Sequence, residues 1–210
     1  MPVDSARFWD RAARKYAKGP IADVEGYERS LDHARRYLKS ADSAFEFGCG
    51  TGTTALKLAP SVARYVATDI SPEMIAIGRE KAAAERVAGL EFAVATPEAA
   101  PYPDASFDAV LCFNVLHLIE DRAAALRGAH RLLKPGGVFI SKTPALTEMG
   151  FMIRLFVPVM QAFGQAPYVG FFGNEKLERE IAEAGFEITE RARHGTKKGD
   201  ARIFLVARKA

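Results

Sequence analysis

The segment with the strongest chemical signal is GCGTG, residues 48–52, in which three glycines alternate with other residues and the acid Glu46 stands two positions upstream. Glycine tolerates positive φ and lets a ligand approach the backbone closely. A helix is expected to begin near Gly52, and the free N–H groups at its start favour an anionic group such as a carboxylate or a phosphate. The pattern predicts a loop that holds a nucleotide-like cofactor.

A second signal is Asp69, which lies 21 residues after Gly48 at the end of an apolar run. An acid at this distance, at the tip of a second strand, accepts hydrogen bonds from ribose hydroxyls. Its negative charge disfavours a 2′-phosphate. The spacing is GxGxG, whereas dinucleotide sites have GxGxxG, and the chain has no GxxxxGK[ST] phosphate loop. These residues predict a nucleoside derivative as the ligand.

The elements that must position these residues follow a regular order. Short apolar runs alternate with helical patterns, which predicts a parallel sheet covered by helices on both faces. Helices are expected at 53–59, 71–87, 120–132 and 174–184, and strands at 44–47, 64–69, 90–95, 107–113 and 138–142. KPGG, residues 134–137, is expected to be a turn. The last two strands, 186–193 and 202–207, are joined by a connection too short for a helix, so they are expected to form an antiparallel hairpin.

Four motifs in this order resemble the class I S-adenosylmethionine-dependent methyltransferases. They are EFGCGTG at 46–52, DISPEM at 69–74, ATPEAAPYPDASFD at 95–108 and LLKPGG at 132–137. The third is similar to the GDAExLPFPDxSFD segment of the small-molecule, ubiquinone/menaquinone-type branch (methyltransferase domain 11/25-like), and the fourth to its RVLKPGG turn. The resemblance covers about residues 40–142. It implies an α/β, Rossmann-like fold, with a seven-stranded, mostly parallel sheet and an antiparallel C-terminal hairpin.

The resemblance also implies S-adenosylmethionine as the cofactor and S-adenosylhomocysteine as the product. The 48–52 loop would cradle the methionine part, Asp69 would bind the ribose and residues 96–98 would lie at the adenine edge. Thr96 stands where the family usually has an acid, and a threonine can still hydrogen-bond the adenine. Asn114 would face the methyl group. The full set of implied cofactor-binding residues is Tyr16, Glu46, Gly48, Cys49, Gly50, Gly52, Thr53, Asp69, Ile70, Met74, Thr96, Pro97, Glu98 and Asn114.

No catalytic residue is assigned from the sequence. Methyl transfer from a sulfonium is an in-line displacement, so a base is needed only if the acceptor must lose a proton. His117 could be that base, or it could cap the next helix or hydrogen-bond the loop. The remaining histidines, His33, His130 and His194, have no metal-ligand spacing, so no metal is expected. Cys49 and Cys112 are expected to be small buried side chains.

Residues 1–210 are expected to form a single domain, in which residues 1–40 are an N-terminal helical cap and residues 144–173 a lid inserted after the fifth strand. Within the cap, residues 4–18 form an amphipathic helix with Phe8, Ala12 and Tyr16 on one face. This helix could cover the cofactor, pack on the sheet or lie on a membrane surface. The lid is rich in Phe, Met and Pro, so it could form an apolar acceptor pocket, pack on the core or pair two chains in a homodimer.

Composition limits the alternatives. The net charge is +3 with a pI of about 8.9, and the two cysteines form no disulfide framework. The weak net charge gives no argument for nucleic acid, and the cysteines predict a cytoplasmic protein. The resemblance implies an enzyme with a small-molecule acceptor. No uninterrupted apolar run reaches about 18 residues, so stable membrane insertion is not expected, while peripheral membrane contact stays open. Two other functions stay open as well: a cofactor-binding regulatory protein without catalysis, and a nicotinamide-dependent oxidoreductase, which the GxGxG spacing disfavours.

Overall fold

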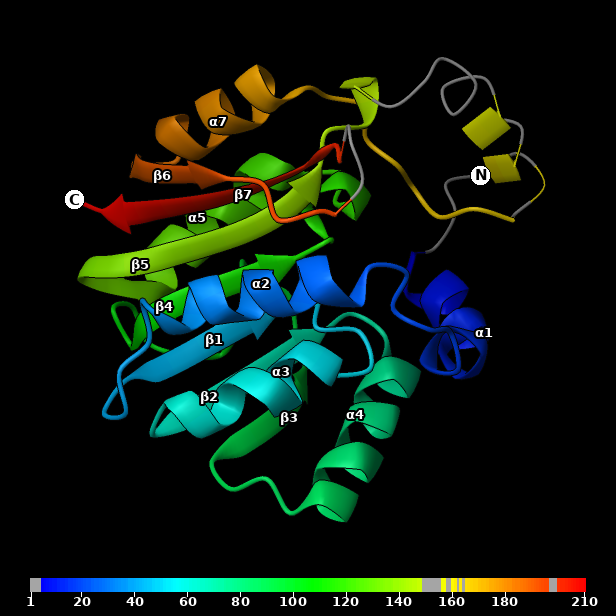
Figure 1. Cartoon of the computed structure of the whole chain (residues 1–210), viewed down its shortest axis with the longest axis horizontal. Helices are drawn as coiled ribbons and strands as arrows, with labels where there is room; N and C mark the ends of the chain where they lie inside the picture. Colours follow the sequence, from blue (N-terminus) through cyan, green and yellow to red (C-terminus); the bar gives the residue numbers. More distant parts are fainter. Residues whose placement is uncertain (1–4, 149–155, 158–159, 162, 164, 197–199) are drawn as a thin grey trace.

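A seven-stranded sheet forms the centre of the molecule in the computed structural model, which describes residues 5–148, 156–157, 160–161, 163, 165–196 and 200–210 (Figure 1). The strand order is β3-β2-β1-β4-β5-β7-β6. The strands are β1 Ser43–Phe47, β2 Arg64–Asp69, β3 Leu90–Val94, β4 Phe107–Phe113, β5 Leu133–Pro144, β6 Phe186–Ala192 and β7 Arg202–Lys209. Only β7 runs antiparallel to its neighbours β5 and β6. The predicted fold class and its C-terminal hairpin are confirmed.

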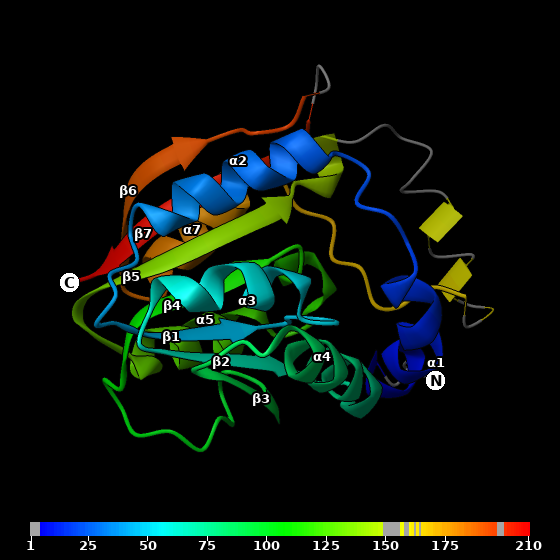
Figure 2. The same ribbon diagram turned by 60° about the horizontal axis from the view of Figure 1, so that its bottom comes forward.

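Helices cover both faces of this sheet (Figure 2). On one face, α2 Val24–Arg35, α3 Thr53–Leu58 and α4 Pro72–Glu85 contribute to a buried apolar cluster with inward side chains of the strands. On the other face, α5 Arg122–Leu132 and α7 Asn174–Glu183 do the same. Three short 3-10 helices, η1 Ala59–Ser61, η2 Leu116–Leu118 and η3 Leu146–Glu148, lie in the connections. No helix in the described part of the chain is both long and apolar enough to cross a membrane.

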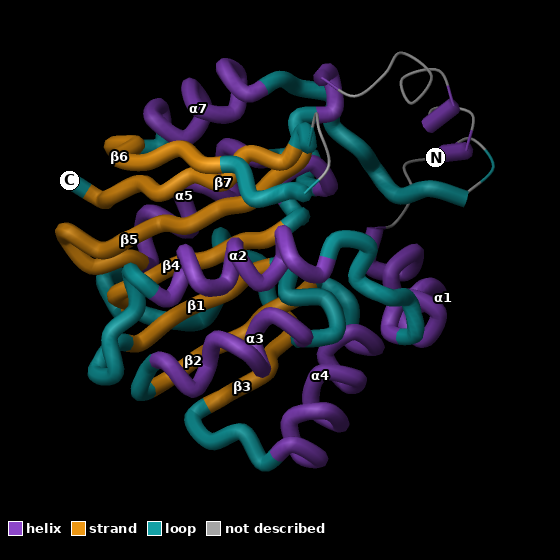
Figure 3. The backbone as a smooth tube through the Cα atoms, viewed as in Figure 1, coloured by secondary structure: helices purple, strands orange, loops and turns teal. Residues whose placement is uncertain are grey.

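β1 and β4 are parallel neighbours, and the strand order reverses between them. The connections that leave their carboxyl ends therefore run in opposite directions. Ligands of open parallel sheets bind at such a point, beyond the carboxyl ends. The loops after β1, β2 and β4 all leave this edge, and α1 Ser5–Ala17 lies on the same side of the sheet (Figure 3). The topology therefore gathers the residues that the motifs predicted at one edge.

Local sequence explains how α4 begins beside this edge. Ser71 is the N-cap, and its hydroxyl accepts a hydrogen bond of 3.1 Å from the Met74 N–H. Pro72 occupies the first helical position and Glu73 the first turn, as predicted. The helix ends at Glu85 rather than near Val87, because Arg86 takes a left-handed conformation with φ 54°.

The predicted start of the fifth strand is wrong. β5 begins at Leu133, before the KPGG segment, and not at Val138. Leu133 pairs with Phe107, while Val138 pairs with Ala109, so the register shifts between the two pairs. The KPGG residues therefore form a bulge within the strand rather than a turn before it. Gly136, with φ 73°, supplies the left-handed residue of this bulge.

The first 40 residues contain two helices with different positions. α2 was not predicted, and its Leu31 and Ala34 are fully buried in the sheet-covering cluster. α1 packs instead on α4, where Ala13 joins Met74 and Ile77 in a small cluster with Trp9. The face of α1 that packs is therefore the one with Trp9 and Ala13, next to the predicted face with Phe8, Ala12 and Tyr16. Both helices lie within the predicted cap over residues 1–40, which stays a prediction.

Part of the predicted lid lies outside the described residues. Phe151, Met152, Leu155 and Val159, four of the apolar residues on which that prediction depended, are among those not described. Three others are described and exposed: Phe156 at 53%, Met160 at 42% and Phe163 at 76%. The lid therefore stays a prediction.

Candidate functional site

The glycine loop needs glycine for two separate reasons. Gly48, Gly50 and Gly52 all have positive φ, of 65°, 54° and 75°. A Cβ at Gly48 would lie 2.2 Å from a methyl carbon of Val115, and one at Gly52 would lie 2.5 Å from the Phe92 ring. The loop therefore packs closely between Val115, which follows β4, and the Phe92 side chain of β3. At Gly50, by contrast, the nearest atom to such a Cβ belongs to the Tyr16 ring, 3.7 Å away. The backbone is open to a ligand at this point.

Asp69 is fixed by the backbone on both of its oxygens. Oδ2 accepts a hydrogen bond of 2.9 Å from the Gly50 N–H, and Oδ1 accepts one of 3.0 Å from the Ser71 N–H. Burial raises the pKa of this carboxyl, and the same N–H groups oppose that shift. A carboxylate offers about four lone-pair sites. Two of these sites are left for the adjacent hydroxyls of a ribose, so the loop and the acid fit a nucleoside cofactor.

Glu46 lies behind the loop and has a different character. It is 1% exposed, and its Oε2 accepts a hydrogen bond of 2.9 Å from the Tyr65 hydroxyl. Burial raises the pKa of Glu46 to about 8, although the Tyr65 hydrogen bond opposes the shift. The carboxyl is therefore mainly protonated at neutral pH. The prediction that it contacts the cofactor stays a prediction.

Both cysteines are free thiols in buried positions. Burial raises the pKa of Cys49 and of Cys112 well above the ordinary value for a thiol. Each side chain therefore stays protonated and acts as a small apolar residue, as expected. Among the residues that the structure describes, no three His, Cys, Asp or Glu side chains come together in a way that could hold a metal ion.

Tyr16 reaches the loop because α1 is anchored at the start of α4. The Asp10 carboxylate accepts hydrogen bonds from the Ser71 hydroxyl, at 2.6 Å, and from the Glu73 N–H, at 3.2 Å. Trp9 lies edge-on to the Tyr16 ring, with 6.1 Å between centroids. Tyr16 is 57% exposed, and its partial burial, followed by the nearby Asp69 carboxylate, raises its pKa. α1 thus brings Tyr16 to the predicted site from outside the sheet.

Other predicted residues lie around this centre. Met74 is buried in the first turn of α4, and Ile70, which is half-buried, lies just before the N-cap of that helix. The Thr53 hydroxyl accepts a hydrogen bond of 3.2 Å from Lys81, so its side chain turns towards α4. Its backbone lies in the first turn of α3, beside the glycine loop.

The predicted adenine edge is the turn after β3. It lies beside Asp69, because the Ala95 N–H donates to the Asp69 carbonyl at 3.2 Å. Within the turn, Thr96 is half-buried, Pro97 is buried and Glu98 is exposed. α5 packs closely against it at Gly128, where a Cβ would lie 2.5 Å from the Glu98 nitrogen. The turn therefore has a fixed position next to the predicted ribose site.

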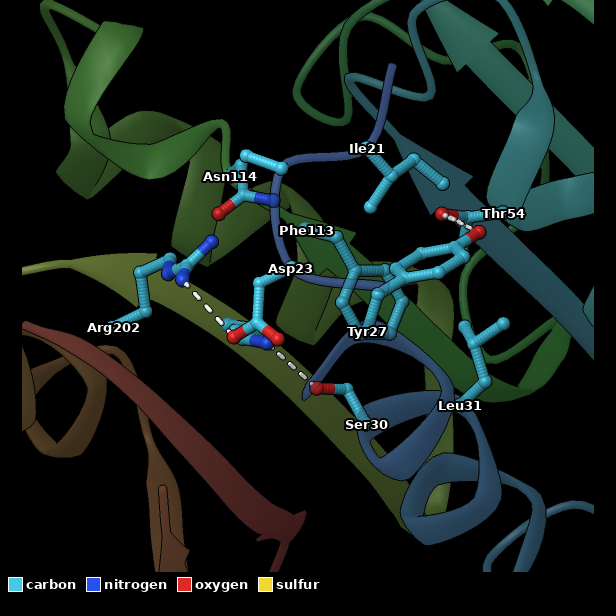
Figure 4. A pocket seen from close by; sticks show the side chains of 11 residues that line it. Ile21, Asp23, Tyr27, Ser30, Leu31, Thr54, Phe113, Asn114 and Arg202 are labelled. Atoms are coloured by element: carbon cyan, nitrogen blue, oxygen red, sulfur yellow. Dashed lines mark hydrogen bonds and ion pairs between the residues drawn. The ribbon is translucent and has the colours of Figure 1, made fainter. Parts of the chain in front are cut away.

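Asn114 marks the other end of the site. It has φ 54°, and its N–H donates to the Lys142 carbonyl at 2.7 Å. Its side chain lines a cavity of about 80 Å³ (Figure 4). The cavity lies between α2, α3 and the ends of β4, β5 and β7, and is lined by Ile21, Ala22, Asp23, Tyr27, Ser30, Leu31, Thr54, Phe113, Asn114, Lys142 and Arg202.

Most of the polar groups in this cavity were not found from the sequence. The hydroxyls of Tyr27 and Thr54 lie 3.2 Å apart, and Arg202 lies 3.8 Å from the Asp23 carboxylate. No motif in the sequence indicates Tyr27, Thr54 or Arg202. Asp23 alone gives a signal, since it is the N-cap of α2 and accepts a hydrogen bond from the Gly26 N–H at 3.0 Å.

His117 follows Asn114, within η2. Burial lowers its pKa to about 4, and its Nδ1 has no hydrogen-bond partner among the described residues. The next helix, α5, is capped by Asp121 instead, which accepts from the Ala124 N–H at 2.9 Å. The expected capping role is therefore wrong. A neutral imidazole with so low a pKa is also a weak general base at neutral pH.

Comparisons with known proteins agree with this geometry. Residues 45–141 match the family described as a methyltransferase domain. YcgJ of Bacillus subtilis, an uncharacterized methyltransferase, is 30% identical over 117 residues, which are 56% of this chain and 46% of that protein. A ubiquinone biosynthesis O-methyltransferase of Xanthomonas oryzae pv. oryzae is 27% identical over 197 residues, which are 88% of this chain and 77% of that protein. The chain thus spans about half the length of the first of these relatives.

Solved structures share the fold. The crystal structure of the [4+2]-cyclase SpnF superposes with a TM-score of 0.79 and 20% identity, over 100% of this chain and 97% of that one. The fold and the family match together define a Rossmann-like α/β methyltransferase. Residues 45–141 thus match a methyltransferase domain, and the similar proteins include methyltransferases named for ubiquinone and menaquinone biosynthesis.

Proposed function

We propose that the protein transfers the methyl group of S-adenosylmethionine to a small, apolar or amphiphilic acceptor and releases S-adenosylhomocysteine. The observation that carries this proposal is the pair of hydrogen bonds that Asp69 accepts from the Gly50 and Ser71 N–H groups. They hold a carboxylate beside an open stretch of glycine backbone, where a ribose and an amino-acid group can bind together.

The chain's own residues would bind and orient the cofactor. Asp69 accepts hydrogen bonds from the ribose hydroxyls, and the turn at 96–98 contacts the adenine. The backbone of the 48–52 loop and Asn114 hold the methionine part, while Tyr16 covers the site and excludes water. When bound, the cofactor supplies a methyl group activated by its positively charged sulfur. The protein then contributes mainly position and electrostatics.

An apolar acceptor is supported by two observations. Phe156, Met160 and Phe163, in the proposed lid over 144–173, expose large apolar side chains. Similar proteins are named as methyltransferases of ubiquinone and of ubiquinone/menaquinone biosynthesis. The cavity beside Asn114 could receive the reacting group of such an acceptor. A cytoplasmic location, a single domain over 1–210 and a homodimer stay predictions, as does the absence of nucleic-acid partners.

A second candidate function is cofactor binding without methyl transfer. The protein SpnF, which shares this fold over its whole length, is named a cyclase. A fold therefore does not fix the reaction that its site performs. The nicotinamide-dependent alternative has no comparable support, since the family match is to methyltransferases.

Two measurements test the proposal. Calorimetry should show binding of S-adenosylmethionine and none of NAD, and binding of NAD alone would overturn it. Incubation with methyl-labelled cofactor and a fractionated metabolite extract should label a small apolar or amphiphilic compound. Binding without label transfer to any fraction would favour the second candidate.

A further inference from the structure

A line of polar side chains leads from the cavity beside Asn114 to the surface, and nothing in the proposed cofactor site uses it. We call it the polar chain; its members are Lys142, Ser30, His194, His33 and Glu190. They come from β5, α2, the connection between β6 and β7, and β6. All five lie on the face of the sheet that α2 covers.

The distances within the polar chain are those of hydrogen bonds. Lys142 Nζ donates to Ser30 Oγ at 2.7 Å, and Ser30 Oγ lies 3.2 Å from His194 Nδ1. His194 Nε2 lies 2.9 Å from His33 Nδ1. His33 Nε2 lies 2.8 Å from a carboxylate oxygen of Glu190, which is the distance of an ion pair, although the angle at this contact is not that of a hydrogen bond. Each member therefore reaches the next without a gap.

The two ends have different surroundings. Lys142 is 5% exposed and lines the cavity, whereas the Glu190 side chain is 39% exposed. The His33 ring between them is stacked on Phe204, with 4.7 Å between centroids. The polar chain thus joins a buried amine in the cavity to a carboxylate at the surface, through the buried His33 and the half-buried His194.

All four contacts can be satisfied in one direction. If both histidines are neutral and carry their proton on Nε2, His194 donates to His33 and His33 donates to Glu190. The Nδ1 of His194 is then free to accept from the Ser30 hydroxyl. Ser30 in turn accepts from Lys142. Its single O–H proton can be donated either to His194 or to the Gly26 carbonyl 2.7 Å away, so the relay requires the hydroxyl to be turned towards His194. A proton that enters at Lys142 can therefore leave at Glu190 by successive short transfers.

We propose that Lys142 takes the proton released when an O–H or N–H group of the acceptor is methylated, and that the polar chain passes it to solvent. This inference rests on the proposed methyl transfer and deepens it, since it makes the acceptor one whose attacking atom carries a dissociable proton. The acceptor's X–H bond breaks, and its electron pair forms the bond to the methyl carbon. The electron pair of the broken methyl–sulfur bond stays on sulfur. The proton goes to the free pair of Lys142 Nζ.

The electrostatic surroundings of Lys142 allow a neutral amine. Burial, the largest cause, lowers the pKa of Lys142. Charges face it from both neighbouring elements: Asp23 and Arg29 from α2, and Asp200 and Arg202 from the start of β7. The two arginines lower its pKa and the two carboxylates raise it.

The histidine next to it is also neutral. Burial is the largest cause that lowers the pKa of His194 to about 4, and the Glu190 carboxylate opposes the shift. His194 therefore does not retain a proton at neutral pH. This is the property that a relay needs, because a group that held the proton would block the next transfer.

The first test is kinetic and uses the full-length protein with the acceptor fraction that the labelled extract identifies. Lys142→Met removes the amine but keeps a long side chain. At pH 7 it should lower the transfer rate by about 100-fold or more, within the range of general-base catalysis. Activity should return as the pH rises past the acceptor's own pKa, because an ionised acceptor needs no base. Ser30→Ala, which interrupts the relay but keeps Lys142, should slow transfer less.

Lys134→Met is the matched control, since Lys134 lies on the same strand and pairs with Asp108 at the other end of the sheet. It should leave the rate within about twofold. An unchanged rate for Lys142→Met, or a loss that a higher pH does not restore, would overturn the inference. In either case normal transfer by the wild type would leave the proposed function standing.

The second test needs no acceptor. Nitrogen-15 NMR of labelled histidines should show the Nε2–H tautomer at both His33 and His194, and carbon-13 NMR should show Lys142 losing its proton below pH 10.5. An Nδ1–H tautomer at His194 would sink the inference, because Ser30 could not then donate to it. A wild-type protein that binds cofactor but labels no acceptor would count against the proposed function, whatever these spectra show.

Discussion

The loop around Asp69 and the polar chain around Lys142 are both buried polar arrangements, but they are built differently. In the first, Asp69 bonds to the Gly50 and Ser71 N–H groups, which are 19 and two residues away. In the second, Lys142 and Ser30 are 112 residues apart, and Ser30 and His194 are 164 apart. The loop region therefore depends on local backbone conformation, whereas the polar chain depends on how four separate elements pack.

The strongest test of the local region is Gly48→Ala. The substitution places a Cβ at positive φ, at a cost of about 1–2 kcal/mol, and forces it into Val115, at a cost of about 1–3 kcal/mol. We expect the free energy of unfolding in urea to fall by about 4 kcal/mol.

Gly136→Ala is its control, because Gly136 has φ 73° but nothing within 4 Å of the added Cβ. It should cost only the backbone part, about 1–2 kcal/mol. Equal losses for the two variants would mean that close packing against Val115 is not what requires glycine in the loop.

The next largest expected effect is a change of stability with pH that comes from Glu46. Its pKa is 4.5 in the unfolded chain and about 8 when folded. A raised pKa stabilises the fold fully below pH 4.5, and this contribution is lost as the pH rises through 8. Glu46→Gln cannot ionise, so it should be the more stable protein at pH 7, by up to about 3 kcal/mol, with little difference at pH 4. Urea unfolding across this range would show it, and an offset equal at every pH would contradict it.

Asp69→Ala should act on binding more than on folding. It leaves ribose hydroxyls and the Gly50 N–H without a partner, and each such loss costs about 1–3 kcal/mol. We expect calorimetry to show S-adenosylmethionine affinity reduced by about 2 kcal/mol, or roughly 30-fold. Asp108→Ala, which removes an acid from the far end of the sheet, should bind normally. Unchanged affinity in Asp69→Ala would show that the ribose does not bind there.

The smallest effect concerns the docking of α1. Ser71→Ala removes the N-cap of α4 and the hydrogen bond to Asp10, so unfolding in urea should become easier by about 1 kcal/mol. Arg14→Ala removes only an exposed pair with Glu80, at 3.5 Å, and should change stability by less than about 0.5 kcal/mol. If the two variants lose the same stability, the Ser71 hydroxyl does not anchor α1.

The sequence predicted the sheet and the loop well for the same reason. Strand and helix patterns repeat over a few residues, and Gly48, Gly50 and Gly52 carry the conformational signal themselves. Predictions failed where distant contacts decide the outcome. The KPGG residues form a bulge because β5 continues its pairing with β4 as far as Phe107. α1 packs through Trp9 and Ala13 because α4 lies beside that face.

The sequence by itself determined the fold class, the glycine loop, Asp69 and the resemblance to methyltransferases, since each of these is encoded in short, ordered motifs. Only the tertiary structure decided that Lys142 is buried in the cavity beside Asn114 and that His33 and His194 meet. The physical reason is that a lysine at the end of a strand and two isolated histidines have no local partner that would reveal them. Their environment comes from side chains more than a hundred positions away, which only the packed sheet and α2 bring together.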